Sequence, residues 1–418
     1  MLEVVRLALA PMLRAWRIGA EAQAQSLPRP TDSPQANAIG IDSDRVLLFG
    51  SGPPVGWGVL SHELALPGAL ARALSNRTGR GADVEAIADP SLVVGSAWAA
   101  LDGRKLWRYD AIVIFLGVND SLELTKVSRW RHDLDRLLDR VRDAASQTTA
   151  IIVVGAQPIR SIDIFDSALG GIADHHSRAL NAASQDVCRR HNRVTYVPMV
   201  APTVRDHLRH RGRETYQEWA DYLAGHLLAP LSAARDEQAA IGETVAQLAA
   251  AEGDRMRAVE GLGLDYGLSE ERFDRVVRLA RNMFGTTSAA FSVIEGDTQW
   301  YKSRAGLDVA STPRDGTLCD QTIRQRGAFV VGDTHDDPLF AHSAVVVGEP
   351  HVRFYAGFPI ESPSGERIGA LCVFDPKPRD ASEVDLQLLR HLALLVQAEL
   401  REERVDPVEP DQWGPASR

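Results

Sequence analysis

Four side chains in this sequence have the chemical types that acyl transfer needs. Ser51 directly follows the apolar run RVLLFG, and Asn119 closely follows the apolar run DAIVIFLG. Asp206 and His210 lie in the basic stretch RDHLRHRGRE. Nucleophilic acyl transfer combines a serine, a histidine base, an aspartate that orients the base and donors for an oxyanion. A single Asp–His pair is common by chance, so a solvated basic loop is the competing interpretation of the last two.

Continuous apolar strands that alternate with helices position these residues. The predicted strands are 45–50, 83–88, 110–117, 150–156 and 194–199, and the predicted helices between them are 62–75, 93–106, 129–146 and 171–191. Strands that are buried on both faces have continuous apolar sequences. The pattern therefore predicts an α/β flavodoxin-like parallel sheet with helices on both faces.

Composition excludes several classes of protein. The chain has 418 residues, which predicts two or three domains, and its net charge of −10 gives no reason to expect a nucleic-acid partner. Three cysteines, Cys188, Cys319 and Cys372, are too few for a disulfide framework or a structural zinc site. We therefore expect a reducing, cytoplasmic setting and no metal or cofactor.

The N-terminus is apolar but does not predict a membrane span. Glu3, Arg6, Pro11 and Arg14 interrupt it, and no stretch of about 18 uncharged apolar residues occurs in the chain. We predict an amphipathic helix that docks on the first domain, with interfacial membrane contact as the alternative. Residues 1–43 comprise this helix and a connector rich in Pro and Ser.

The pattern changes after the first domain, which is predicted to span 44–233. Residues 234–262 predict a linker helix, and its apolar positions suit a dimer seam, so we expect a homodimer. These positions are Ile241, Val245, Leu248 and Met256. The second domain, 263–404, has short strands and flanking helices that predict an α+β antiparallel sheet. The tail 405–418 is Pro-rich, which predicts disorder.

The elements of the second domain follow from the same kind of pattern. The predicted strands are 288–295, 298–303, 328–332, 353–360 and 367–375. One helix begins near Ser269, and a final helix begins at Ser382. Helical spacing predicts that they bury Phe273, Val276, Val277, Ala280, Met283, Leu389, Leu392, Val396 and Leu400.

Two stretches of the first domain resemble the SGNH hydrolases, also called GDSL-type esterases. They are FLGVNDSLELTKVSRWRHDLDRLLDRV at 115–141 and YQEWADYLAGHL at 216–227. The resemblance covers nearly all of 45–231 and implies ester hydrolysis, with Asn119 of GVND as an oxyanion-hole donor. A turn residue that caps the following segment is the alternative role of Asn119.

The first catalytic block departs from that family. The family pattern is G-D-S-x-x-x-G-x-G, whereas this chain has Gly50, Ser51 and Gly52, followed by Gly56 and Gly58. The aligned glycines put Gly52 in the place of the nucleophile. A slip of one residue matters because neighbouring side chains at a strand end point to opposite sides. Ser51 could act only if the turn were rebuilt.

Two further blocks also depart from the pattern. The Gly donor of the second block falls on Ser91, with Gly95 as the alternative. In the fifth block, D-x-x-H-P, His210 takes the place of the base and His207 that of the acid, with Asp206 one residue earlier. We therefore expect a domain without activity, whose Ser51, Asn119, Asp206 and His210 are vestigial or rearranged.

Residues 255–403 resemble a GAF domain. The resemblance rests on stretches such as SVIEGDTQWYKSRAGLD, FVVGDTHDDPLFAHSAVVVGEPHVRFYAGFPI and GERIGALCVFDPKPRD. It implies a ligand pocket between the sheet and the segments near 301–345. The implied pocket residues are Trp300, Lys302, Cys319, Asp333, Asp336 and Tyr355.

Each of these pocket residues also has a structural interpretation. Trp300 and Tyr355 would pack the core, and the two aspartates would cap turns. Cys319 is more readily a small buried hydrophobe than a redox centre. We predict a small anionic or polar ligand, with Lys302 and Tyr355 closest to it.

The leading hypothesis is a cytoplasmic sensory or regulatory protein. Its GAF-like domain would bind an unidentified small molecule and act on an inactive SGNH-like domain or on a protein partner. The alternative is a carboxylic-ester or acyl hydrolase regulated by the GAF-like domain. An oligomeric assembly protein is a third class, favoured only if side chains fill the pocket.

Overall fold

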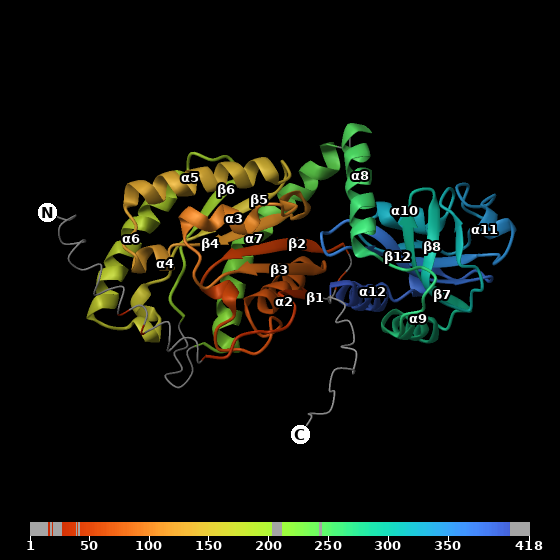
Figure 1. Ribbon diagram of the computed structural model, residues 1–418, viewed down its shortest axis with the longest axis horizontal. Coiled ribbons are helices and arrows are strands. Elements are labelled where there is room, and N and C mark those ends of the chain that lie inside the picture. Colours follow the sequence, from red (N-terminus) through yellow and green to blue (C-terminus); the bar gives the residue numbers. More distant parts are fainter. Residues whose placement is uncertain are drawn as a thin grey trace, which may run out of the picture. The chain divides into compact units, whose positions relative to one another are not determined.

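The chain forms two compact units, Met1–Glu243 and Thr244–Arg418 (Figure 1). The computed structural model describes residues 16, 19, 27–38, 40, 42–202, 211–241 and 245–401, without the side chains of 238–241 and 245–250. No helix in this described part is both long and apolar enough to cross a membrane. Most of the predicted N-terminal helix and the predicted tail lie outside it. Trp16 is described, and its ring packs 5.5 Å from that of Phe165.

The first unit is built on a six-stranded sheet. Its order is β1 (Gln35–Ala38), β3 (Ala82–Ala88), β2 (Asp44–Gly50), β4 (Ala111–Phe115), β5 (Ala150–Val154) and β6 (Val194–Val197). All pairs are parallel except β1 with β3. This confirms the predicted α/β flavodoxin-like parallel sheet. The edge strand β1 was not predicted, because QANA has no strand pattern and was assigned to the connector.

Helices cover both faces of this sheet. On one face α2 (Leu66–Thr78) and α7 (Arg213–Ile241) enclose a core that includes Trp219. On the other face α3 (Ala97–Leu101), α5 (Val127–Ala144) and α6 (Ala168–Cys188) enclose a core that includes Trp130. The short α4 (Val118–Leu122) follows β4 directly. The carboxyl ends of β2, β4 and β5 therefore meet at one edge of the sheet.

The second unit is an antiparallel sheet with helices on both faces. Its order is β10 (Phe329–Val331), β11 (Phe354–Glu361), β12 (Arg367–Asp375), β7 (Ser288–Glu295), β8 (Thr298–Ala305) and β9 (Ser311–Pro313). One face carries α8 (Val245–Leu262), α9 (Glu271–Phe284) and α12 (Leu386–Arg401). The other carries α10 (Leu318–Arg324) and α11 (Ala344–Val347). The elements β9, α10 and α11 were not predicted.

The core prediction for this unit needs one correction. Met283 was predicted to be buried, but it is 53% exposed because the buried face of α9 ends at Ala280. Met256, one of the predicted seam positions, is half-buried, and its sulfur accepts a hydrogen bond from the Gly296 N–H at 3.2 Å, which does not test the seam. The other seam positions have no described side chains, so the homodimer stays a prediction.

Candidate functional sites

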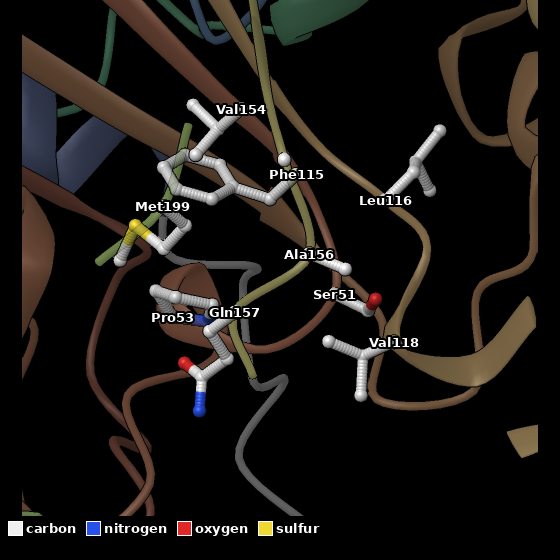
Figure 2. Close-up of a pocket in the computed structure, with 10 residues that line it drawn as sticks. Ser51, Pro53, Phe115, Leu116, Val118, Val154, Ala156, Gln157 and Met199 are labelled. Carbon is white, nitrogen blue, oxygen red and sulfur yellow. The ribbon is translucent and has the colours of Figure 1, made fainter. Parts of the chain in front are cut away.

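A pocket opens in the first unit at the carboxyl ends of the central strands (Figure 2). Its enclosed volume is small, about 10 Å³, which is room for about one water molecule. Most of its lining is apolar. The lining residues are Ser51, Pro53, Phe115, Leu116, Val118, Val154, Gly155, Ala156, Gln157 and Met199. Open α/β sheets bind their ligands at this edge, so the pocket is the candidate site of this unit.

Ser51 is held at the pocket by the sheet itself. Its backbone N–H donates to the carbonyl of Phe115 at 2.9 Å. The residue is only 3% exposed, and its hydroxyl has no hydrogen-bond partner among the described residues. A buried hydroxyl without a partner costs free energy unless a ligand or water satisfies it. The Ser51 hydroxyl is therefore an uncommitted polar group in the pocket wall.

The turn after Ser51 is shaped for glycine. Gly52 has a φ of +77°, a conformation that strains any other L-residue. A Cβ at this position would meet no heavy atom within 4 Å, so it faces open space. A serine side chain would fit that space but not that backbone. The alignment of Gly52 with the nucleophile is still a prediction.

Asn119 is committed to the backbone of a neighbouring loop. Its Nδ2 donates to the carbonyls of Pro90 at 2.8 Å and Leu92 at 2.9 Å. Because carbonyls only accept, these bonds fix the orientation of the amide and use both of its hydrogens. An oxyanion-hole donor must instead direct its hydrogen at the reacting oxygen. In this arrangement Asn119 fastens the loop after β3 to α4.

The predicted donors of the second block are no better placed. The N–H of Ser91 donates to the side chain of Asp89 at 2.8 Å. At Gly95, a Cβ would lie 3.4 Å from a carboxylate oxygen of Asp133. Neither Ser91 nor Gly95 is among the residues that line the pocket.

Asp206, His207 and His210 lie outside the described residues, but Arg211 is described and was not predicted. It is 6% exposed, and its Nη2 donates to Oε1 of Gln157 at 3.4 Å. Its guanidinium lies 5.0 Å from the ring centre of Trp219. Its Nη1 has no hydrogen-bond partner in the described part of the chain. Burial lowers the pKa of Arg211, although an arginine stays cationic.

Asp120 is a second buried ionisable group that the sequence did not reveal. It is 1% exposed and accepts hydrogen bonds from the Val94 N–H at 3.2 Å and the Thr125 hydroxyl at 3.3 Å. Burial raises the pKa of its carboxyl to about 7, although these bonds act in the opposite direction. The ionised form is therefore unfavourable in the folded protein.

In the second unit, two predicted pocket residues lie on the α9 face of the sheet. The Lys302 ammonium donates to the carbonyls of Asp265 at 2.6 Å and Leu268 at 2.8 Å, and pairs with Glu270 at 2.8 Å. Trp300 stacks on Tyr266, with ring centres 5.2 Å apart. Lys302 therefore ties β8 to the segment that leads into α9.

The other predicted pocket residues of this unit do not lie beside Lys302 and Trp300. Tyr355 and Cys319 are buried on the opposite face, where the Tyr355 hydroxyl lies 2.7 Å from that of Thr322. Asp333 forms an ion pair with Arg353. Lys302 and Tyr355 were expected to face one ligand, and this pairing is wrong, because they lie on opposite faces of the sheet. Asp336 is exposed in the same turn as Asp333.

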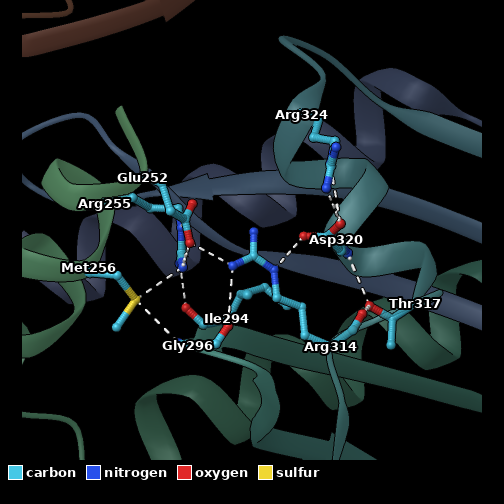
Figure 3. Close-up of polar contacts among 9 residues, drawn as sticks. All are labelled: Glu252, Arg255, Met256, Ile294, Gly296, Arg314, Thr317, Asp320 and Arg324. Carbon is cyan, nitrogen blue, oxygen red and sulfur yellow. Dashed lines mark hydrogen bonds and ion pairs between the residues drawn. The ribbon is translucent and has the colours of Figure 1, made fainter. Parts of the chain in front are cut away.

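A charged network joins α8 to α10 in this unit (Figure 3). Arg314 donates to Glu252 of α8 at 2.6 Å and to Asp320 of α10 at 2.7 Å. Arg255 also donates to Glu252, at 2.7 Å, and Arg324 donates to Asp320 at 2.7 Å. These bonds, with those from Arg255 first, lower the pKa of Glu252 to about 2. Arg314 is the shared cation of the network.

Comparison with known proteins identifies both domains. The GDSL-like Lipase/Acylhydrolase family matches residues 49–228, and the GAF domain family matches residues 269–400. The chain therefore contains a GDSL-like lipase/acylhydrolase domain followed by a GAF domain. Both folds described above agree with this.

Individual relatives cover parts of the chain. The cyclic di-GMP phosphodiesterase PA2567 of Pseudomonas aeruginosa is 37% identical over 150 residues, which are 36% of this chain and 26% of that protein. The chain thus spans about a quarter of its length. Est24, a carbohydrate acetylesterase from Sinorhizobium meliloti, is 16% identical, with a TM-score of 0.35, over 45% of this chain and 99% of that one. A free methionine-R-sulfoxide reductase from Neisseria meningitidis is 18% identical, with a TM-score of 0.27, over 35% and 85%.

Replacing Asp120 with Asn tests the buried carboxyl. In the unfolded chain the carboxyl titrates near pH 4, so ionisation destabilises the native protein progressively from about pH 4 to about pH 7. We expect the melting temperature of Asp120→Asn relative to the native protein to rise across this range and to level off above it. The exposed Asp102→Asn is the matched control. A difference that does not depend on pH would contradict the assignment.

Replacing Arg314 with Gln tests the network. Asp320 would keep only Arg324, and Glu252 would lose its link to α10. We expect a loss of about 1.5–3 kcal/mol of stability and faster hydrogen exchange at the α10 amides. Arg304→Gln, at an exposed position of β8, is the control. Equal exchange in both variants would show that the network does not hold α10.

Proposed function

We propose that this protein is a sensory or regulatory protein in which the GAF domain acts together with a GDSL-like domain that binds ligands without hydrolysing esters. The observation that carries the proposal is the pair of hydrogen bonds from Asn119 to Pro90 and Leu92. They occupy the donor that the family resemblance assigns to the oxyanion. A hydrolase site without that donor loses about 10²–10³ in kcat.

The turn at Ser51 and Gly52 also supports a domain that does not hydrolyse esters. Ser51 sits one residue before the place of the nucleophile, and its N–H is bonded to Phe115. Gly52 offers no hydroxyl at all. The pocket still offers a lining to which a ligand can bind. The hydroxyl that would attack an ester and the amide that would stabilise the oxyanion are not in the positions that the family pattern requires.

Several observations support the sensory part. GAF domains commonly bind small molecules, and the partial identity with a cyclic di-GMP phosphodiesterase agrees with a GAF domain joined to another unit. The network through Arg314 links α10 to α8, the helix that begins the second unit. A change in α10 would therefore reach α8, the first helix of the second unit. We place the protein in the cytoplasm, because its three cysteines are free thiols.

An ester hydrolase regulated by the GAF domain is the second candidate. One observation favours it: the Ser51 hydroxyl lines the pocket and has no other hydrogen-bond partner among the described residues. Such an enzyme would need a base from the segment that carries Asp206 and His210.

An ester assay separates the two candidates. We expect the full chain to hydrolyse p-nitrophenyl acetate and butyrate no faster than Ser51→Ala, because the oxyanion donor is occupied. A fluorophosphonate probe should leave Ser51 unlabelled. Turnover and labelling that both disappear in Ser51→Ala would overturn the proposal in favour of the hydrolase.

A further inference from the structure

Two buried thiols of the GAF domain face each other. Cys319 lies on α10 and Cys372 on β12, and their sulfur atoms are 3.9 Å apart. Both thiols are free, and the residues are 3% and 1% exposed. From the sequence, Cys319 was expected to be a small buried hydrophobe rather than a redox centre. A second thiol beside it changes that interpretation, because two neighbouring thiols can form a disulfide.

The surroundings make the two thiols chemically different. The Tyr355 hydroxyl donates to the Cys319 sulfur at 3.5 Å. The hydrogen bond with Cys372, and smaller effects of those with Ser292 and Tyr355, lower the pKa of Cys319, although burial acts in the opposite direction. The bond to Cys319 and burial raise the pKa of Cys372. Cys319 is therefore the thiol that ionises first, and the thiolate is the form of cysteine that attacks an oxidant.

Cys319 lies next to a residue of the charged network in Figure 3. The following residue, Asp320, accepts hydrogen bonds from Arg314 and Arg324, each at 2.7 Å. Arg314 also donates to Glu252 of α8 at 2.6 Å. A disulfide bond is about 2.0 Å long, so its formation would draw α10 toward β12. The oxidation state of Cys319 would thus act on the segment that Asp320 ties to α8.

We propose that Cys319 and Cys372 form a reversible disulfide when hydrogen peroxide reaches the GAF domain, and that this thiol pair senses the oxidant. This rests on the proposed function in that it names the input of the sensory domain. Disulfides in a reducing compartment are usually transient and serve catalysis or redox sensing.

The reaction has two steps. The Cys319 thiolate attacks the peroxide, so that an S–O bond forms, the O–O bond breaks and hydroxide leaves. The Cys372 sulfur then attacks the sulfenic acid of Cys319, so that an S–S bond forms, the S–O bond breaks and a second hydroxide leaves. The two hydroxides take up the two thiol protons. The two thiols together lose two electrons, and one hydrogen peroxide becomes two molecules of water.

Burial of the thiols does not exclude so small an oxidant. Hydrogen peroxide is close to water in size, and the reaction needs no cavity of ligand dimensions. The helix α10 has seven residues, and it carries the exposed Arg324 at its end. Local opening of so short a surface element needs much less free energy than global unfolding. The resolving thiol needs no access, because it already faces Cys319.

Peptide mapping of the full native chain tests the proposal. The reduced chain is treated with hydrogen peroxide without denaturant, catalase removes the peroxide, and N-ethylmaleimide then alkylates the remaining thiols in denaturant. We expect the tryptic peptides 315–324 and 368–379 to be joined by a disulfide that dithiothreitol cleaves. Cys188 should be alkylated. It is the internal control, because it lies in the first unit and burial raises its pKa to about 12.

Variants assign the two roles. In Cys372→Ala the sulfenic acid of Cys319 lacks its resolving thiol, so dimedone should label Cys319. In Cys319→Ala, oxidation of Cys372 should be at least about tenfold slower than in the native chain. Cys188→Ala should form the disulfide as the native chain does. Hydrogen exchange at the α10 amides should be at least about threefold slower in the oxidised native chain than in the reduced one, because the cross-link opposes local opening.

Melting temperatures show whether the variants fold, and if one does not, the mapping and exchange of the native chain decide the question. Alkylation of all three thiols after peroxide treatment would overturn the proposal. Oxidation of Cys188 as fast as that of Cys319, or α10 exchange that does not respond to the disulfide, would also overturn it. These results would leave the proposed function standing with another input. Ester turnover would overturn the proposed function instead, and it would leave the disulfide result standing.

Discussion

The pairing of β2 with β4 is the constraint on which the first domain's site depends. Gly50 lies opposite Phe115, and a Cβ at Gly50 would fall 1.9 Å from the Phe115 carbonyl oxygen. Only glycine permits that approach. The same carbonyl accepts the Ser51 N–H, so the ladder continues through Ser51 before the chain turns. This hydrogen bond holds Ser51 at the end of the strand, before the turn that begins at Gly52.

The two domains differ in whether their buried charged groups have partners of opposite charge. In the GAF domain, Lys302 is satisfied by two carbonyls and Glu270, and Arg314 has two carboxylates. These cations hold segments of the fold together. In the GDSL-like domain, Asp120 is buried with a raised pKa, and Arg211 keeps an unsatisfied donor. Groups that cost stability are typical of binding sites rather than of structural cores.

In the GAF domain, strand β8 departs from the regular alternation of side chains. At β8 the register shifts between Phe291 and Ser292, opposite the stretch from Tyr301 to Ser303. The bulge places both Lys302 and Ser303 on the α9 face, where Ser303 bonds to Asp274. A strict alternation would have separated them. Alternation from Trp300 puts Lys302 on the α9 face, and the bulge adds Ser303 to the same face.

The sequence by itself determined the two folds. Burial on both faces of a parallel sheet leaves continuous apolar runs, and burial on one face of each helix leaves a helical period, and both can be counted along the chain. The strands around Leu48, Val113 and Ile152 follow from that signal alone. Only the tertiary structure decided the state of the site. Whether the Asn119 amide is free depends on carbonyls 27 and 29 residues away, and whether Arg211 is paired depends on its neighbours in space. Hydrogen-bond partners are set by distance in space, and such distances leave no period in a sequence.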